Sequence, residues 1–300
     1  MRHYEALIGW RAATGFFLAG IYPVGMKIAS QWFPKGLGAA LGLLVGALVL
    51  GSASAHGLRG LGAALPWPSV MLGVAALAAA GGVLLYCLLP EPPHPAGHAR
   101  APRFDVHALA TLWTDRRVRA SVFGYFGHMW ELYTVWVLVP LIRATRLDGA
   151  ALSFAAFGVL SAGALGCVAG GRWAQRVGSA RVAAVQLAAS GLCCLAAAVL
   201  MDAPGWLFGA WLVLWGITVA GDSPQFSALT ATNAPRHAVG SVLTLTNSVG
   251  FAISIVSIEL HVRLAQHVPL DRLLPWLAIG PALGLWMLHG LRHGAPAPGT

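Results

Sequence analysis

Residues 220–236 read AGDSPQFSALTATNAPR, and residues 19–35 read AGIYPVGMKIASQWFPK. The two stretches align without a gap, and in each the second proline is followed by a basic residue, Lys35 or Arg236. The aligned identities are Gly15 with Gly216, Ala19 with Ala220, Gly20 with Gly221, Pro23 with Pro224, and Pro34 with Pro235. Two prolines at the same spacing are rare in chance matches between apolar segments, so we interpret the two stretches as copies of an internal repeat.

Apolar runs of about 20 residues surround both copies, each long enough to span a hydrocarbon core of ~30 Å. They lie near residues 8–30, 37–58, 69–89, 119–142, 151–170, 181–201, 205–228, 239–262 and 271–291. In lipid only helices and closed barrels satisfy the backbone, and these runs lack the alternation of barrel strands. The sequence therefore predicts an all-α polytopic membrane protein with about nine transmembrane helices.

Composition agrees with this fold class. The chain has 300 residues, of which 57% are hydrophobic and only 10% are charged, and the mean hydropathy is +0.71. A soluble domain carries roughly 25% charged residues. These values exclude a soluble enzyme, a disordered chain and a disulfide scaffold. The cysteines Cys87, Cys167, Cys193 and Cys194 all lie in apolar runs and are interpreted as small buried hydrophobes.

The longest connection, residues 90–118, is rich in proline and arginine and is interpreted as a linker between two bundles. Basic residues concentrate on its side of the membrane, which predicts a cytoplasmic linker and C-terminus. The net charge of +9 is assigned to this orientation and not to a nucleic acid partner. We therefore expect a partial bundle at 1–89, the linker at 90–118, a six-helix bundle at 119–292 and a cytoplasmic tail at 293–300.

The repeat has a consequence for the first bundle. Three expected helices lie between the linker and the second copy, at about 119–201, whereas none precedes the first copy. The sequence thus corresponds to three helices plus six, where six plus six are expected. Either a start placed too far downstream or a truncated gene would account for this, and the second leaves open a remnant without transport activity.

These features resemble the major facilitator superfamily, in which two six-helix bundles are joined by a long basic cytoplasmic linker. Residues 11–52, RAATGFFLAGIYPVGMKIASQWFPKGLGAALGLLVGALVLGS, resemble the fourth and fifth helices of that family. GGRWAQRVGSAR, residues 170–181, is similar to its loop motif between the eighth and ninth helices, with Gln175 in place of the usual Asp. The residues that match this cytoplasmic gating motif are Gly171, Arg176, Gly178 and Arg181.

The resemblance implies a secondary transporter of the plasma (inner) membrane that works by alternating access. Its partners would be the lipid bilayer and a small-molecule substrate, with protons as one interpretation of the coupling ion. No cofactor, metal or enzymatic activity is expected, and the oligomeric state is left open.

Polar groups within the spans are the candidate substrate or proton-coupling residues, because such groups are costly in lipid. His128 and Glu131 are three residues apart in GYFGHMWELYTVW, so they share a helix face. They would either bind substrate or relay protons, or else form a locally satisfied pair that holds helices together.

A second candidate is GDSPQFS, residues 221–227, where Asp222, Ser223 and Gln225 adjoin Pro224. A proline breaks the helix, and broken helices line the cavities of many transporters. A kink capped by Asp222 or Ser223 is the structural alternative. Asn247, within the eighth expected span, would contact substrate or bond a neighbouring helix.

A membrane-embedded metalloenzyme is the alternative from another functional class. His128 and Glu131 would supply two ligands, but a catalytic metal needs about three, so Asp222 or His261 would have to join them. The sequence has no GxxxxGK[ST] motif, which argues against a primary pump.

Overall fold

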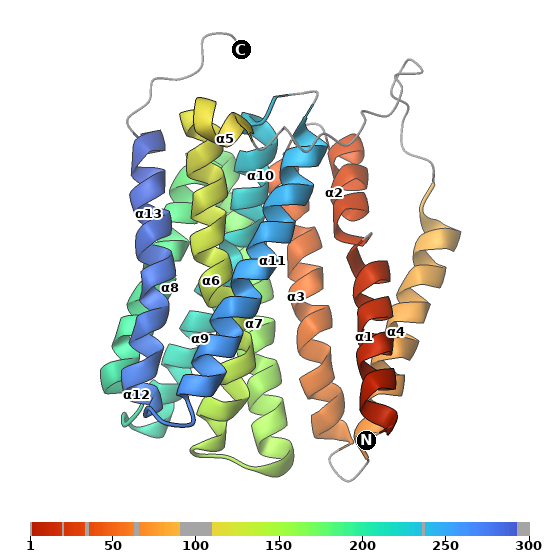
Figure 1. Ribbon diagram of the computed structural model, residues 1–300, viewed down its shortest axis with the longest axis vertical. Helices are drawn as coiled ribbons and strands as arrows, with labels where there is room; N and C mark the ends of the chain where they lie inside the picture. Colours follow the sequence, from red (N-terminus) through yellow and green to blue (C-terminus); the bar gives the residue numbers. More distant parts are fainter. Residues whose placement is uncertain are drawn as a thin grey trace.

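The computed structural model describes residues 2–19, 21–33, 36–62, 66–90, 110–235 and 238–292. Every regular element in these ranges is helical, which confirms the all-α prediction (Figure 1). The elements are α1 (Arg2–Ala19), α2 (Ile21–Trp32), α3 (Leu37–Leu61), α4 (Trp67–Leu88), α5 (Thr111–Thr114), α6 (Arg116–Ala144), α7 (Gly149–Val177), α8 (Ser179–Leu200), α9 (Gly205–Gly221), α10 (Ser223–Asn233), α11 (Val239–Leu264), α12 (Leu270–Leu273), the 3-10 helix η2 (Leu274–Ala278) and α13 (Ile279–Arg292).

The long helices run alternately up and down, roughly side by side (Figure 1). Helices α6 to α13 pack around one another, while α1 to α4 lie along one side of that group. Helix α3 makes the main contact between the two groups because it packs along α7. Helix α4 has no buried residue and lies at the outside, as expected for a helix surrounded by lipid.

Six segments are long and apolar enough to cross a membrane by length and composition. They are Leu37–Leu61, Trp67–Leu88, Gly149–Val177, Ser179–Leu200, the joined pair α9 and α10 at Gly205–Asn233, and Val239–Leu264. These segments correspond to six of the nine expected spans. The described residues therefore establish a multi-pass helical membrane protein with six such spans.

The other three expected spans are helical but less regular or less apolar. The expected span at 8–30 falls on α1 and α2, which the structure describes on either side of residue 20. The span at 119–142 lies inside α6, which carries His128 and Glu131 in its middle and arginines near both ends. The span at 271–291 begins in α12 and η2, so that α13 itself has only 14 residues. The number nine stays a prediction.

The structure describes a helix break in the second copy of the repeat, where α9 ends at Gly221 and α10 begins at Ser223. Pro224 lies in the first turn of α10, directly after this break. In the first copy, the residue that aligns with Gly221 is Gly20, which lies outside the described residues. The internal repeat stays a prediction from the sequence.

The domain boundaries are only partly within the described residues. Most of the expected linker, residues 91–109, and the expected tail at 293–300 lie outside them. Within the linker range, α6 already begins at Arg116, where the Asp115 side chain accepts the backbone N–H groups of Arg117 and Val118 at 2.7 and 3.3 Å. This is an ordinary N-cap, which explains why the helix starts before residue 119.

Candidate functional site

The centre of the candidate site is the break between α9 and α10. Pro224 has no backbone N–H, so it cannot continue the hydrogen-bond ladder of α9. Asp222 lies in the turn, and its carbonyl accepts the N–H groups of Gln225 and Phe226 at 3.0 Å to begin α10. The Asp222 side chain is fully buried. The sequence thus places a carboxyl group inside the helical bundle at a point where the backbone is interrupted.

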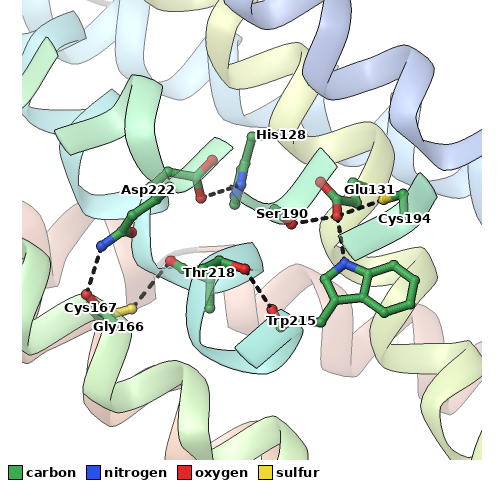
Figure 2. A network of polar contacts seen from close by, with 11 residues as sticks. His128, Glu131, Gly166, Cys167, Ser190, Cys194, Trp215, Thr218 and Asp222 are labelled. Atoms are coloured by element: carbon green, nitrogen blue, oxygen red, sulfur yellow. Dashed lines mark hydrogen bonds and ion pairs between the residues drawn. The ribbon is translucent and has the colours of Figure 1, made fainter. Parts of the chain in front are cut away.

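Asp222 meets His128 of α6 across this break. The His128 Nδ1 and Asp222 Oδ1 atoms are 2.8 Å apart, and both side chains are buried (Figure 2). The imidazole ring is close to the rings of Tyr125 and Phe226, with centroid distances of 5.8 and 6.1 Å. His128 Nε2 and Asp222 Oδ2 have no hydrogen-bond partner within the described part of the chain. The pair therefore keeps a free donor or acceptor position on each side chain.

Glu131 has a different environment, although it lies one turn from His128 on α6. Its Oε1 atom accepts hydrogen bonds from Ser190 Oγ at 2.5 Å, Cys194 Sγ at 3.1 Å and Trp215 Nε1 at 2.7 Å (Figure 2). Ser190 and Cys194 belong to α8 and Trp215 belongs to α9. One buried carboxyl oxygen thus joins three helices, which resembles the structural alternative considered for this residue.

The two α6 residues therefore share a helix face, as expected, but they have separate partners. His128 contacts α10 through Asp222, whereas Glu131 contacts α8 and α9. Among the arginines whose side chains the structure describes, none is fully buried, and Arg119 and Arg143 are half-buried. The buried ionisable groups with an acidic or imidazole side chain are His128, Glu131, Asp222 and His261.

Within the described ranges, no side-chain hydrogen bond joins Ser223, Gln225 or Asn247 to the His128–Asp222 pair, although the backbone N–H of Gln225 donates to the Asp222 carbonyl. Ser223 is buried at the start of α10. Gln225 is fully buried, and neither of its amide atoms has a partner among the described residues. An added Cβ atom on Gly38 of α3 would lie 3.9 Å from its Oε1 atom. Asn247 is half-buried on α11, with an unpartnered Nδ2 atom.

The predicted gating motif lies at the junction of α7 and α8. Gly171 is buried against α3, where an added Cβ atom would lie 2.9 Å from the Gly38 carbonyl oxygen. Gly178 joins the two helices with a φ of 87°, a conformation that favours glycine. Arg176 and Arg181 are exposed. The glycines of the motif therefore have clear structural roles, while its gating function stays a prediction.

Several residues of the site were missed by sequence reasoning. Cys194 and Trp215 donate to Glu131, and Cys167 donates to the Ala220 carbonyl oxygen at 3.3 Å. The interpretation of the cysteines as small buried hydrophobes is therefore incomplete, and it is wrong for Cys87, which is exposed on α4. A buried tryptophan usually has a partner for its N–H group, but nothing in the sequence distinguishes Trp215 from the other tryptophans of the chain.

The geometry does not favour the metalloenzyme alternative. Within the described ranges, no group of three His, Cys, Asp or Glu side chains is placed to hold a metal ion. His128 and Asp222 converge, but the Glu131 oxygen that would join them is surrounded by donors from Ser190, Cys194 and Trp215.

Comparison with known proteins agrees with this architecture. The family model described as Major Facilitator Superfamily matches residues 2–258. The chain belongs to this superfamily of membrane transporters. No curated protein matches the chain.

Among solved structures, the chain is similar to the crystal structure of a variant of the E. coli fucose:proton symporter FucP, with a TM-score of 0.54 and 18% sequence identity. The match covers 76% of this chain and 55% of the symporter chain. At this identity the likeness concerns the fold, and the chain spans little more than half the length of the structure it matches.

Proposed function

We propose that the protein is a secondary transporter that moves a small solute by alternating access, with the His128–Asp222 pair as its proton-coupling site. The helices of α1–α4 and of α6–α13 would be the two moving bodies, with nine crossings of the inner membrane and a cytoplasmic linker and C-terminus. The family, the fold and the apolar helices support this assignment. The buried pair at a broken helix is the single observation that carries the coupling.

The physical argument concerns the cost of charge in a low dielectric. Burial favours the neutral form of a carboxyl group, while a nearby imidazolium favours the charged form. Asp222 and His128 are 2.8 Å apart, so the gain or loss of one proton changes the net charge of the pair. A site whose charge changes on protonation has different stabilities when it faces the two sides of a membrane. Proton transfer can therefore be linked to the movement of the two bodies.

The buried charges also bear on the solute. Among the side chains described, the fully buried acidic and imidazole groups are two carboxyl groups and two histidines, and a charged carboxylate disfavours a nearby anion. We therefore expect a solute without net negative charge. Fucose belongs in a first panel with other neutral sugars, because the similar structure is that of a fucose:proton symporter.

The test uses the purified full chain in liposomes with an imposed pH gradient. A panel of neutral sugars, organic cations and organic anions is offered, and uptake is measured with the gradient present and collapsed. We expect gradient-driven uptake by the wild type and its loss in Asp222→Asn and His128→Gln. Glu259→Gln serves as the control because Glu259 is exposed and pairs only with Arg263, one turn away, among the contacts described.

The proposal has two clear points of failure. Uptake by Asp222→Asn that still follows the pH gradient would remove the coupling role of the pair. The absence of any gradient-driven uptake by the wild-type chain would contradict the transport function itself. If uptake by Glu131→Gln still follows the pH gradient, the role of Glu131 is to hold the helices together, as its three hydrogen-bond donors suggest.

A further inference from the structure

Helices α7 and α9 approach each other along a seam of glycines. An added Cβ atom on Gly163 would lie 2.9 Å from the Gly216 carbonyl oxygen, and one on Gly166 would overlap the Ile217 carbonyl oxygen. The backbones are therefore in direct contact, as in small-residue packing between membrane helices. Cys167 follows in this seam, and its short side chain reaches the last turn of α9.

The Cys167 thiol meets the carbonyl group that the proline leaves without its usual partner. In an uninterrupted helix, the N–H group of residue 224 would donate to the carbonyl oxygen of Ala220, but Pro224 has no N–H. The Cys167 Sγ atom lies 3.3 Å from this oxygen (Figure 2). The Asp222 N–H within the turn is its other donor. The thiol and the turn together occupy the two acceptor positions of the Ala220 carbonyl.

The backbone of the same cysteine contacts the other group of helices. An added Cβ atom on Gly42 of α3 would lie 2.6 Å from the Cys167 carbonyl oxygen. Cys167 is fully buried between these two contacts. A separation of α3 from α7 at Gly42 would therefore alter the surroundings of the residue whose thiol donates to the Ala220 carbonyl beside the break.

We propose that Cys167 is a positioning residue, whose thiol holds the α9–α10 break so that Asp222 lies against His128, and which links that break to the α3–α7 contact. This inference rests on the proposed function, since it concerns the same pair. The titratable groups that face Asp222 are His128 and, at longer range, Glu131 from α6, and Cys167 from α7. Loss of the thiol would leave the Ala220 carbonyl short of a donor and loosen the turn that carries Asp222.

The experiment measures the state of Asp222 without requiring a substrate. A hydrophobic carbodiimide reacts with protonated carboxyl groups in apolar surroundings, and the labelled peptides are quantified by mass spectrometry across a pH series. We expect Cys167→Ala to label at Asp222 about 3- to 10-fold faster near neutral pH, because a carboxyl that leaves the imidazole is more often protonated. Cys167→Ser retains a donor and is expected to restore the wild-type rate within about twofold.

A second test uses a variant in which residue 224 has a backbone N–H group that can donate to the Ala220 carbonyl. In Pro224→Ala the residue regains its N–H, so adding Cys167→Ala should change Asp222 labelling by less than about twofold. Cys87→Ala is the matched control for loss of a thiol, because Cys87 is exposed on α4. The labelling of Glu131 in the same samples reports any general loosening of the bundle.

Three outcomes would overturn the inference. The first is a labelling rate of Asp222 that does not change in Cys167→Ala. The second is an equal change of that rate in Cys167→Ala and Cys167→Ser. The third is an effect of Cys167→Ala that is the same in the wild type and in Pro224→Ala. If carbodiimide labelling of Asp222 depends on pH and on Cys167 as expected, the positioning role of Cys167 is supported even when the liposomes show no uptake. Failure of the positioning role and failure of the transport proposal are thus separate results.

Discussion

The three hydrogen bonds to Glu131 lead to a quantitative prediction about stability. Replacement by leucine removes the oxygen that accepts from Ser190, Cys194 and Trp215. A buried donor left without a partner costs about 1–3 kcal/mol. The serine hydroxyl can turn to a backbone carbonyl of its own helix and a thiol is a weak donor, so the rigid Trp215 N–H bears most of the cost.

We therefore expect Glu131→Leu to be less stable than Glu131→Gln by about 1–3 kcal/mol, because glutamine retains a carbonyl oxygen as acceptor. The assay is reversible unfolding in mixed dodecylmaltoside and SDS micelles, followed by far-ultraviolet circular dichroism. Glu259→Leu is the matched control; Glu259 is exposed and its ion pair is at the surface, so the change should stay within about 0.5 kcal/mol.

Equal unfolding midpoints for the leucine and glutamine variants would refute the reasoning. In that case the oxygen of Glu131 would contribute nothing that an apolar side chain of similar size does not. A large loss in the Glu259 control would instead show that the assay reports general damage to the chain.

Two further predictions concern packing and charge. Gly166→Val should destabilise the fold by at least about 1–3 kcal/mol, since its side chain would enter the backbone of α9, whereas Gly158→Val, with open space around it, should cost under about 1 kcal/mol in the same unfolding assay. His128→Leu should cost about 3–5 kcal/mol by leaving Asp222 buried alone, and the double variant with Asp222→Leu should recover most of that loss. A double variant no more stable than the single one would disprove mutual dependence of the pair.

The helical class and most helix positions could be predicted because lipid imposes simple rules on length and polarity. The break at Asp222 was also predictable, since Pro224 removes one backbone donor and the repeat places Pro23 at the corresponding point. The position of α3 along α7, by contrast, depends on how glycines on both helices match in space. A single sequence shows where the glycines are but not which glycines of α3 and α7 are in contact.

The candidate site could be predicted only in part. Ionisable side chains such as His128, Glu131 and Asp222 are energetically unfavourable in an apolar span and therefore rare there, so they could be found by residue type. Their partners are ordinary residues: Ser190 and Cys194 lie in a run of small side chains that is typical of any packed helix. Only the fold shows that Glu131 accepts from three donors, whereas one oxygen of Asp222 has no hydrogen-bond partner among the residues that the structure describes.

The contact between α3 and α7 also affects how one group of helices can be displaced against the other. When two helices with large interdigitated side chains slide along each other, the side chains collide, and each collision adds an energy barrier. Where Gly42 faces Cys167 and Gly171 faces Gly38, few side-chain atoms can collide. We expect the α3–α7 contact to be destabilised by one extra methyl group and yet to present a low energy barrier to axial translation. The same glycines would account for both properties.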